Sequence, residues 1–418
     1  MFFITPPRSR RPTIPLNLMR RSLAAFLVSL VCLIPVHGQD TIPTEVPSAC
    51  TWSEIIGQKL DSLTRLPLMQ RTQLGLYVYD LTADEPLFAH HIHQQLRPAS
   101  CQKLVTAISA LKVLGSDFCF RTTLDYTGTI ADSVLTGDIW ISGSFDPLFS
   151  RSDLNGFVKK LTDAGIHRIE GHIHFDRSLC DTVKAGWGWC WDDDNPPLTP
   201  LLLNGKATFE TTWLDALTRA GITRPNDYTY GRKPSDATCL TMVCHTIDQV
   251  LLPMMKKSDN LCAEALFMRL AAHSGTPYAG RQEAVGEIND VYAEAGVDKK
   301  AYEIADGSGL SLYNYTTPHC LVSLLRLAWQ NPQLRRHLVP SLPVAATDGT
   351  LSKRMKGTKA DGNIKAKTGT VTGVSTLAGY LTAPNGHTLC FAILNQGLYH
   401  TADGRRLQDA VCTALTAP

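Results

Sequence analysis

The sequence Arg97-Pro98-Ala99-Ser100-Cys101-Gln102-Lys103-Leu104 places a serine and a lysine three residues apart, at the start of an apolar run. The run continues to Leu114 without a helix breaker, so residues 104–114 are predicted to form a buried helix that begins near Ser100. Residues i and i+3 share a helix face, so the Lys103 ammonium can approach the Ser100 hydroxyl. A lysine enclosed by apolar groups can lose its proton and then accept one from serine. The pair is a candidate nucleophile and activating base.

The same spacing recurs at Ser109 and Lys112, further along the predicted helix. There we expect an exposed serine and an exposed lysine. A single Ser-x-x-Lys match is therefore a weak signal, and other motifs must support it.

Two further motifs add to the first. Ser258-Asp259-Asn260 lies between two predicted helices. Ser258 can relay a proton between the Lys103 amine and a leaving group, and Asn260 can hydrogen-bond a substrate amide.

Lys367-Thr368-Gly369 lies on a predicted strand. Lys367 can supply a fixed positive charge, and Thr368 can offer its hydroxyl to a substrate carboxylate. Gly369 is expected to let the substrate backbone approach the strand edge.

The composition is that of an ordinary globular protein with two or three domains. The chain has 418 residues, of which 44% are hydrophobic and 19% charged, and its formal net charge is +2. This balance provides no electrostatic field for gathering nucleic acid. We expect no nucleic-acid partner and instead a small or neutral one.

The N-terminus resembles an export signal. Arg20 and Arg21 precede an apolar segment, residues 22–35, that is too short to span a bilayer, and small residues follow at 36–38. Residues 1–38 are predicted to be a signal peptide, so the mature protein is expected to be exported, with at most peripheral membrane contact.

Two details of this region stay open. Met19 precedes the two arginines directly and would itself make a normal signal start. Cys32 could accept a lipid, but the residue before it, Val31, is larger than such sites usually have, which disfavours lipidation.

Eleven cysteines follow the signal peptide, and this odd count disfavours a complete disulfide framework. The pairs Cys180/Cys190 and Cys239/Cys244 are close in sequence, but the sequence cannot decide whether they bond. Buried free thiols are expected where cysteines fall in apolar patterns: Cys101, Cys262, Cys390 and Cys412.

The two ends of the chain are predicted to build one antiparallel sheet flanked by helices, an α+β fold. A helix is expected at residues 51–63, and another at 405–415. The expected strands are residues 74–81, 87–91, 364–368, 375–382 and 388–395.

The middle of the chain divides into two regions. Residues 122–244 contain short β-rich runs and two helical stretches broken by Gly, Pro and Asp, which indicates an inserted α+β module. Residues 247–337 are mostly helical. We therefore expect one domain formed by residues 39–121 and 245–418, interrupted by the module.

Two segments offer alternative interpretations. His90, His91 and His93 lack accompanying ligands at metal spacing, so a solvated strand end is favoured over a metal site. Residues 186–194, rich in Trp and Asp, could be a carbohydrate platform or an acidic metal loop, but a packed aromatic loop is favoured.

The three motifs, in this order, resemble the signature of penicillin-binding proteins and class A β-lactamases. Ser100 and Ser258 are 158 residues apart, and the excess length is the inserted module. This organisation resembles the low-molecular-mass class C penicillin-binding proteins, the D-alanyl-D-alanine carboxypeptidase/endopeptidase family. Other stretches that look like family segments are residues 143–148, 186–193, 306–314 and 348–351.

The resemblance implies a serine β-lactamase/DD-peptidase (transpeptidase-like) fold and acyl transfer on peptidoglycan stem peptides. Ser100, assisted by Lys103, would attack the penultimate D-alanine carbonyl, and the N–H groups of Ser100 and Thr370 would bind the oxyanion. D-Alanine, or a cross-linked neighbouring stem, would leave, and water would then cleave the acyl-enzyme. The resemblance implies no metal or cofactor, β-lactams as covalent inhibitors, and a periplasmic location.

Two alternative functions compete with this one. A serine β-lactamase needs a separate carboxylate to activate the deacylating water, and no motif supplies it. A wall-binding protein without turnover would be expected to lack Ser100 or Lys103, and both are present.

The sequence specifies the substrate less fully than it specifies the reaction. Asp146, in the stretch 143–148, is a candidate ligand for an ammonium group on the stem side chain, although Asp146-Pro147 could equally begin a turn. The family often has an arginine where this chain has Leu312, so the third residue of the stem stays open.

Overall fold

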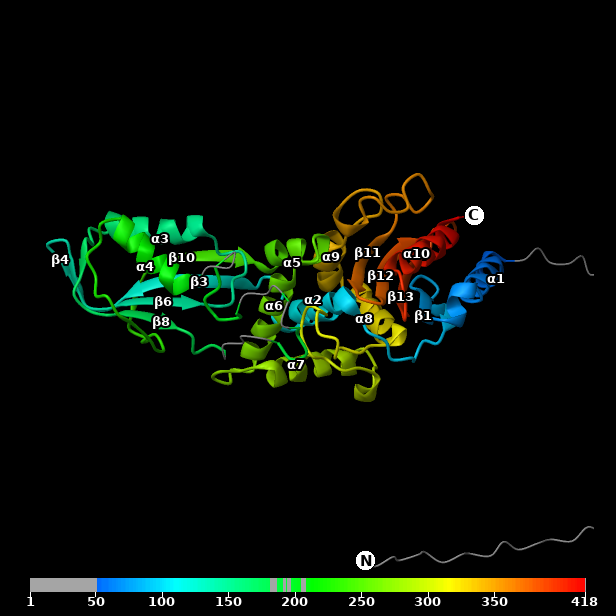
Figure 1. The fold of residues 1–418 in the computed structure, drawn as a ribbon, viewed down its shortest axis with the longest axis horizontal. Helices are drawn as coiled ribbons and strands as arrows, with labels where there is room; N and C mark the ends of the chain where they lie inside the picture. Colours follow the sequence, from blue (N-terminus) through cyan, green and yellow to red (C-terminus); the bar gives the residue numbers. More distant parts are fainter. Residues whose placement is uncertain (1–50, 181–185, 191–192, 194–196, 204–207, 418) are drawn as a thin grey trace, which may run out of the picture. The chain divides into compact units, whose positions relative to one another are not determined.

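The computed structural model describes residues 51–180, 186–190, 193, 197–203 and 208–417 (Figure 1). The predicted signal peptide, Cys50, and most of the acidic end of the 186–194 loop lie outside these ranges. Within the described ranges, no helix combines the length and apolar content needed to cross a bilayer.

Both ends of the chain contribute to one five-stranded sheet, in the order β11-β12-β13-β1-β2, with every neighbouring pair antiparallel. This confirms the predicted sheet. The turn between β12 and β13 contains Asn385 and Gly386, with Gly386 at a φ of +83°, as hairpin turns of this sequence favour. The strands are β1 (Gln73–Asp80), β2 (Glu85–His90), β11 (Lys365–Val371), β12 (Val374–Thr382) and β13 (Thr388–Gln396).

Helices cover both faces of this sheet, as Figure 1 shows for α10 (Thr401–Thr416) beside β12 and for α8 (Pro318–Gln330) beside β1 and β13. Side chains alternate along β1: Leu76 and Val78 belong to the cluster that includes α10 and α1 (Trp52–Thr64). Tyr77 and Tyr79 belong to the larger cluster that includes α8. Seven of the eight β1 residues are buried because neither face meets solvent.

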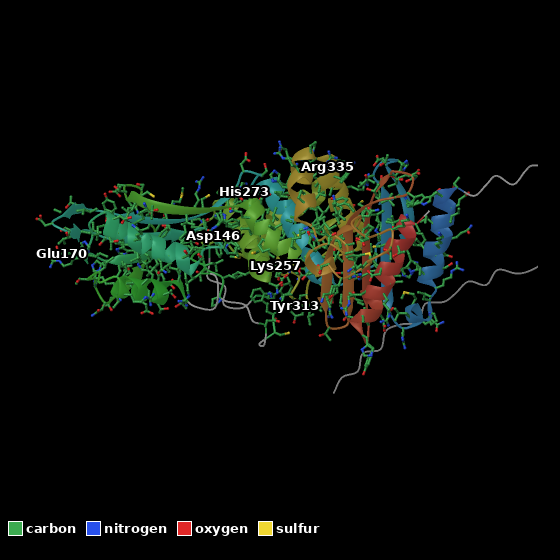
Figure 2. All side chains as sticks on the ribbon, turned by 90° about the horizontal axis from the view of Figure 1, so that it is seen from above. Asp146, Glu170, Lys257, His273, Tyr313 and Arg335 are labelled. Carbon is green, nitrogen blue, oxygen red and sulfur yellow. The ribbon has the colours of Figure 1, made fainter. Side chains whose placement is uncertain are left out.

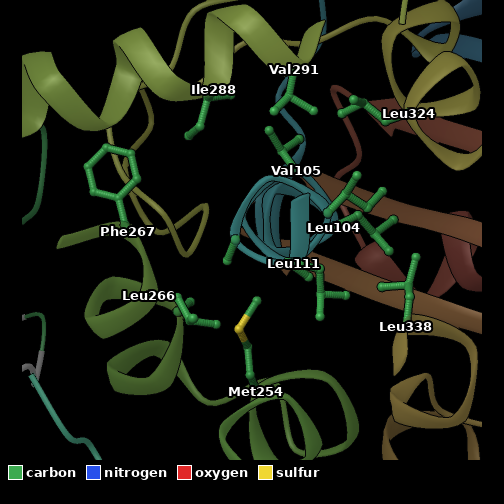
Figure 3. Packing of buried hydrophobic residues seen from close by; sticks show 14 of the residues in the cluster. Leu104, Val105, Leu111, Met254, Leu266, Phe267, Ile288, Val291, Leu324 and Leu338 are labelled. Atoms are coloured by element: carbon green, nitrogen blue, oxygen red, sulfur yellow. The ribbon is translucent and has the colours of Figure 1, made fainter. Parts of the chain in front are cut away.

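The helix after Ser100 lies at the centre of the larger cluster. A 3-10 turn (Ala99–Cys101) leads into α2 (Gln102–Val113), of which ten residues are buried. Figure 3 shows apolar side chains converging on α2 from the surrounding helices, among them Met254, Leu266 and Leu338. A helix that is apolar on most faces needs such a surrounding. The helices around it are α5 (Ile247–Lys256), α6 (Asn260–His273), α7 (Arg281–Glu294), α8 and α9 (Pro332–Ser341).

The prediction of an exposed Ser109 is wrong. Ser109 is 0% exposed, and its hydroxyl has no hydrogen-bond partner in the part of the chain that is described. Lys112 is exposed, as expected, and pairs with Glu294 at 2.7 Å. Tertiary packing around α2 buries a position that helical periodicity alone had placed at the surface.

The segment expected to form the inserted module has its own sheet, in the order β10-β3-β6-β8-β9, and its own hydrophobic cluster. The chain enters along β3 and returns beside it along β10, with Thr246 opposite Cys119. The elements are β3 (Cys119–Tyr126), β6 (Ile139–Gly143), α3 (Arg151–Asp163), β8 (Ile173–Asp176), α4 (Phe209–Arg219), β9 (Tyr228–Tyr230) and β10 (Thr238–Thr246).

A small sheet, β4-β5-β7, and strand β9 were not predicted. Each of these strands has two or three residues, too few for an alternating pattern to be recognised. They are β4 (Thr129–Ala131), β5 (Val134–Thr136) and β7 (Arg168–Ile169).

The cysteines expected in apolar elements (Cys101, Cys262, Cys390 and Cys412) are buried. Cys239 and Cys244 are exposed on β10, and no disulfide joins them.

The loop of residues 306–314 packs closely against the start of α2. Gly309 has a φ of +81°, and a Cβ at this position would lie 1.8 Å from the Ala99 carbonyl oxygen. Only glycine meets both requirements, because it has no Cβ and accepts the left-handed region.

We predict that Gly309→Ala destabilises the protein much more than Gly296→Ala does. Gly296 has a φ of +73°, but a Cβ added there would have no atom within 4 Å. Its alanine variant therefore measures only the free-energy cost of the left-handed backbone, about 1–2 kcal/mol. The Gly309 variant adds a collision with backbone. Thermal unfolding of the two variants tests this, and equal losses would contradict the close contact.

Candidate active site

The turn that carries Ser100 has a strained backbone. Ala99 has a φ of +45°, a conformation that residues with a Cβ rarely adopt. Ser100 itself is partly exposed, and the next N–H, that of Cys101, donates to the Pro98 carbonyl at 3.1 Å. Strain of this kind persists only where the surrounding structure enforces it, and it is concentrated at functional sites.

The Lys103 side chain is 0% exposed, and its ammonium reaches three oxygen atoms. Nζ donates to Ser100 Oγ at 3.1 Å, to Asn260 Oδ1 at 2.7 Å and to the Ser308 carbonyl at 2.8 Å. Burial lowers the pKa of Lys103 to about 8, against the opposing attraction of Glu264 and other carboxylates. A large fraction of this amine is neutral at mildly alkaline pH, so it can accept the Ser100 proton.

Lys367 is also 0% exposed. Its Nζ donates to Ser258 Oγ at 2.9 Å and to the Thr368 carbonyl at 2.8 Å. Burial, reinforced by the charge of Lys103, lowers the pKa of Lys367 to about 7. This differs from the sequence expectation of a fixed charge, because no carboxylate in the described ranges pairs with Lys367 to hold the proton.

The Ser258 motif lies at the junction of α5 and α6. Ser258 has a φ of +61°, so the site holds another non-glycine residue in the left-handed region besides Ala99. Asp259 caps α6 by accepting the Cys262 N–H at 3.0 Å, which directs Asn260 toward Lys103.

The hydrogen bonds divide the site into two pairs. Ser258 bonds to Lys367, and no hydrogen bond joins Ser258 to Lys103 within the described residues. The geometry therefore connects Ser258 with the second lysine, whereas the sequence had suggested a relay with the first. Two amine–hydroxyl pairs, Lys103–Ser100 and Lys367–Ser258, lie in one site.

Gly369 meets a packing requirement that the sequence did not predict. A Cβ there would lie 2.1 Å from Thr376 Oγ1, 2.8 Å from the Pro98 carbonyl and 2.9 Å from the Ser100 nitrogen. The missing side chain thus lets β11 approach the Ser100 turn, and the expected approach of a substrate backbone stays a prediction. Thr376 completes this contact by donating to the Pro98 carbonyl at 2.8 Å.

Thr368 and Thr370 lie on the same strand as Lys367 and are more exposed to solvent than it is. Thr370 is exposed and Thr368 is half-buried. Thr368 Oγ1 donates to Thr350 Oγ1 at 2.7 Å, so the hydroxyls of two threonines lie together. The role of Thr350 was missed, although its segment, 348–351, had been noted as family-like.

An ion pair fixes the Thr350 segment to the end of α5. Lys256 Nζ lies 2.6 Å from Asp348 Oδ2, and Asp348 Oδ1 also accepts the Val344 N–H at 2.9 Å. Gly349 has a φ of +57°, and its Cβ would lie 2.6 Å from the Lys256 carbonyl. This contact positions both Thr350 and the segment that leads to Ser258.

Two buried carboxyls that interact with the charge of Lys103, those of Glu264 and Asp306, were not predicted as site residues. Glu264 is 3% exposed and accepts the N–H groups of Gly307 and Ser308, at 3.2 and 2.8 Å. Burial, then the charge of Asp306, raises the pKa of Glu264 to about 8. The available sequence signal was a single carboxyl inside the otherwise apolar α6 pattern.

Asp306 organises the loop that supplies the third Lys103 acceptor. Its Oδ1 accepts the Gly309 N–H at 2.7 Å, and its Oδ2 accepts the Ser311 N–H at 2.7 Å. Trp189 Nε1 donates to the same Oδ2 at 2.8 Å. The loop at 186–190 is therefore hydrogen-bonded to the loop whose Ser308 carbonyl accepts from Lys103.

Trp187, unlike the packed Trp189, is exposed to solvent. It is 49% exposed and lies 5.0 Å from the Tyr313 ring, with the Arg281 guanidinium 4.4 Å from its own ring centroid. The expectation of a packed aromatic loop holds for Trp189, and the acidic residues Asp192 and Asp194 lie outside the described residues.

Asp146 lies in the segment between β6 and α3 (Figure 2) and is 1% exposed. Its Oδ2 is 2.7 Å from His245 Nδ1, and its Oδ1 accepts the Leu148 N–H at 3.0 Å. Both oxygens are thus occupied. This geometry favours the turn over the binding of a substrate ammonium, because a substrate would first have to displace His245.

The described residues contain no group of three or more His, Cys, Asp or Glu side chains that could hold a metal ion. His90 and His91 contact each other, with ring centroids 4.1 Å apart, whereas His93 lies 5.0 Å from His319.

Comparisons with known proteins find similarity to D-alanyl-D-alanine carboxypeptidases. A model of the D-Ala-D-Ala carboxypeptidase 3 (S13) family matches residues 56–203 and 201–417. A D-alanyl-D-alanine carboxypeptidase of Actinomadura sp. (strain R39) is 27% identical, over 94% of this chain and 90% of that protein. The corresponding Haemophilus influenzae enzyme is 26% identical, over 82% of this chain and 88% of that protein.

The fold agrees with these matches. The crystal structure of penicillin binding protein 4 from Haemophilus influenzae aligns with a TM-score of 0.73 and 22% identity, covering 84% of this chain and 97% of that one. At this identity the structural likeness establishes the fold alone.

We predict that Glu264→Gln changes how stability depends on pH. A carboxyl whose folded pKa is about 8 holds its proton at neutral pH, whereas the unfolded chain releases it near about pH 4. This contribution to stability is therefore present at low pH and is lost as the pH rises toward about 8. Calorimetry should show the wild-type Tm falling relative to the variant between about pH 5 and about pH 8.

Glu294→Gln is the matched control, because Glu294 is 47% exposed and pairs only at the surface with Lys112. It should leave the pH dependence almost unchanged. Parallel curves for wild type and Glu264→Gln would contradict the raised pKa.

Proposed function

Because the chain belongs to the D-Ala-D-Ala carboxypeptidase 3 (S13) family, we propose that Ser100 is its acylated nucleophile in a serine D-alanyl-D-alanine carboxypeptidase. The observation that carries this assignment is the 3.1 Å hydrogen bond between Ser100 and the buried Lys103 amine. A neutral lysine at this distance can take the hydroxyl proton as the oxygen attacks a carbonyl.

The substrate is a peptidoglycan stem peptide that ends in D-alanyl-D-alanine. Ser100 attacks the penultimate carbonyl, and the N–H groups of Ser100 and Thr370 stabilise the oxyanion. The leaving amine takes a proton, for which Ser258 and Lys367 form the second amine–hydroxyl pair. Water then cleaves the ester and frees Ser100. Release of a cross-linked neighbouring stem in place of D-alanine is the endopeptidase form of the same reaction.

The substrate carboxylate binds at Lys367, Thr368 and the adjacent Thr350 hydroxyl. A carboxylate placed beside Lys367 favours the charged amine, so substrate binding raises the pKa of Lys367 from its low value of about 7. Gly369 acts indirectly, because it lets β11 contact the Ser100 turn.

Penicillins react at the same serine, because their strained amide offers Ser100 an equivalent carbonyl and the acyl-enzyme then persists. A β-lactamase activity is disfavoured. The two carboxyls that act most strongly on the charge of Lys103, Glu264 and Asp306, are buried and accept backbone N–H groups, so neither is free to activate a deacylating water.

We also propose that residues 122–244 are an inserted module of the peptidase domain. The side-by-side strands β3 and β10 and the separate hydrophobic cluster support this boundary. Residues 1–38 are proposed as a signal peptide, because a cell-wall substrate lies outside the cytoplasm and the segment has signal-like patterning. The mature enzyme is accordingly periplasmic.

We expect Ser100 to be the acylation site. Labelled penicillin should attach to the wild type and to Ser109→Ala, and intact mass should rise by one acyl group. Ser100→Ala should not be labelled. Ser109 is the matched control because it has the same Ser-x-x-Lys spacing, on the helix that follows Ser100, but is fully buried. Labelling of the Ser100 variant would remove the basis of the assignment.

The two lysines should respond differently to replacement by arginine. Arginine keeps its charge at all accessible pH values, so Lys103→Arg should abolish acylation, whereas Lys367→Arg should retain part of it. In the wild type, acylation should rise with pH through about 8, because only neutral Lys103 accepts a proton. The measurement is the rate of penicillin acylation against pH. Equal residual rates in the two variants would refute these separate roles.

A further inference from the structure

A cationic cavity lies away from the proposed active site, where the ends of β3, β6 and β8 meet α6. Its volume is about 290 Å³, and a second cavity of about 210 Å³ shares Ser178, Leu179 and Arg232 with it. Among the described residues, four cationic side chains and one carboxylate line the larger cavity. The cations are Arg121, Arg232, Lys233 and Arg269, and the carboxylate is Asp176.

The carboxylate does not neutralise the arginines. Asp176 Oδ1 accepts the N–H and hydroxyl of Ser178, at 2.9 and 2.7 Å, and Oδ2 accepts the Lys233 N–H at 3.0 Å. The Lys233 ammonium pairs with the buried Asp125, 3.0 Å away. Asp176 is therefore committed to the backbone, and only Lys233 among the four cations has a carboxylate partner in the described ranges.

Arg269 is the most unusual member of the group. Its Nε atom is buried without a hydrogen-bond partner in the described part of the chain, and its guanidinium lies 5.1 Å from the Phe118 ring centroid. Burial lowers the pKa of Arg269. Arg269 as a whole is only partly exposed, and its Nε atom is fully enclosed. A desolvated guanidinium without a carboxylate partner in the described ranges is costly unless an anion satisfies it.

We propose that this cavity binds an oxyanion, a phosphate or carboxylate group, between the guanidinium groups of Arg269 and Arg232. Guanidinium groups bind both kinds of oxyanion through two parallel hydrogen bonds. The adjoining cavity, lined in part by Arg232 and the exposed Tyr278, accommodates the rest of the bound molecule.

The site is separate from the catalytic residues but connected to them by one helix. Asn260 begins α6 and Arg269 lies nine residues further along, roughly 14 Å at 1.5 Å per residue. Figure 2 labels His273, at the end of the same helix. The proposal does not depend on the catalytic function, because it rests on charge and burial alone.

The test is isothermal titration calorimetry of the full chain at constant ionic strength, with inorganic phosphate as one probe and succinate as the other. Saturable binding of at least one probe is expected. Arg269→Met, which keeps the packing on Phe118, and Arg232→Met, at an exposed position, should each weaken it roughly tenfold or more. Arg219→Met, on the exposed end of α4, is the matched control and should bind like the wild type.

Comparison of the probes identifies the source of the oxyanion. Preference for phosphate indicates a phosphate-bearing ligand, and preference for succinate indicates a carboxylate-bearing one. The Arg232 variant keeps the test decisive if Arg269→Met fails to fold, which thermal unfolding would reveal. Absence of saturable binding to the wild type, or equal affinity in wild type and Arg232→Met, would overturn the proposal.

Discussion

Burial of two ammonium groups is the constraint on which the site depends. Lys103 and Lys367 are both 0% exposed, and their hydrogen-bond acceptors are hydroxyl, amide and carbonyl oxygens. Such neutral acceptors replace bulk water only in part, so the charged forms are disfavoured. The resulting pKa values, about 8 and about 7, allow both amines to exchange protons near neutral pH. Proton transfer to and from a serine oxygen requires this property.

The fold enforces this burial through close backbone contacts. Gly309 and Gly369 allow a loop and a strand to reach the Ser100 turn, where side chains would collide with backbone atoms. Ala99 and Ser258 remain in the left-handed region because the packed helices and the sheet leave them no relaxed alternative. The strain at Ala99, beside Ser100, and at Ser258 itself is thus offset by the large apolar cluster around α2.

Residues 122–244, which lie in sequence between the two parts of the chain that form the central sheet, also contact the residues that hold Lys103. Trp189 donates to Asp306, and Asp306 holds the loop whose Ser308 carbonyl accepts from Lys103. Asp146 pairs with His245 at the return of β10, so a carboxylate that looked like a substrate ligand instead joins two segments of the chain. The residues at 122–244 therefore contribute to the support of the site as well as to a separate core.

The sequence by itself determined the strands of the central sheet, the helix after Ser100 and the three motifs, but not the short strands β4, β5, β7 and β9. Strong periodicity predicted the five strands of the sheet and the helix after Ser100, because each is long enough to repeat its pattern. Spacing along one helix predicted the Ser100–Lys103 contact, because i and i+3 neighbours meet by local geometry. Tertiary structure alone decided the burial of Ser109, the pairing of Ser258 with Lys367, the packing role of Gly369 and the enclosure of Asp146. Each depends on segments that are far apart in sequence, and periodicity carries no information about which distant backbone or charge a side chain will meet.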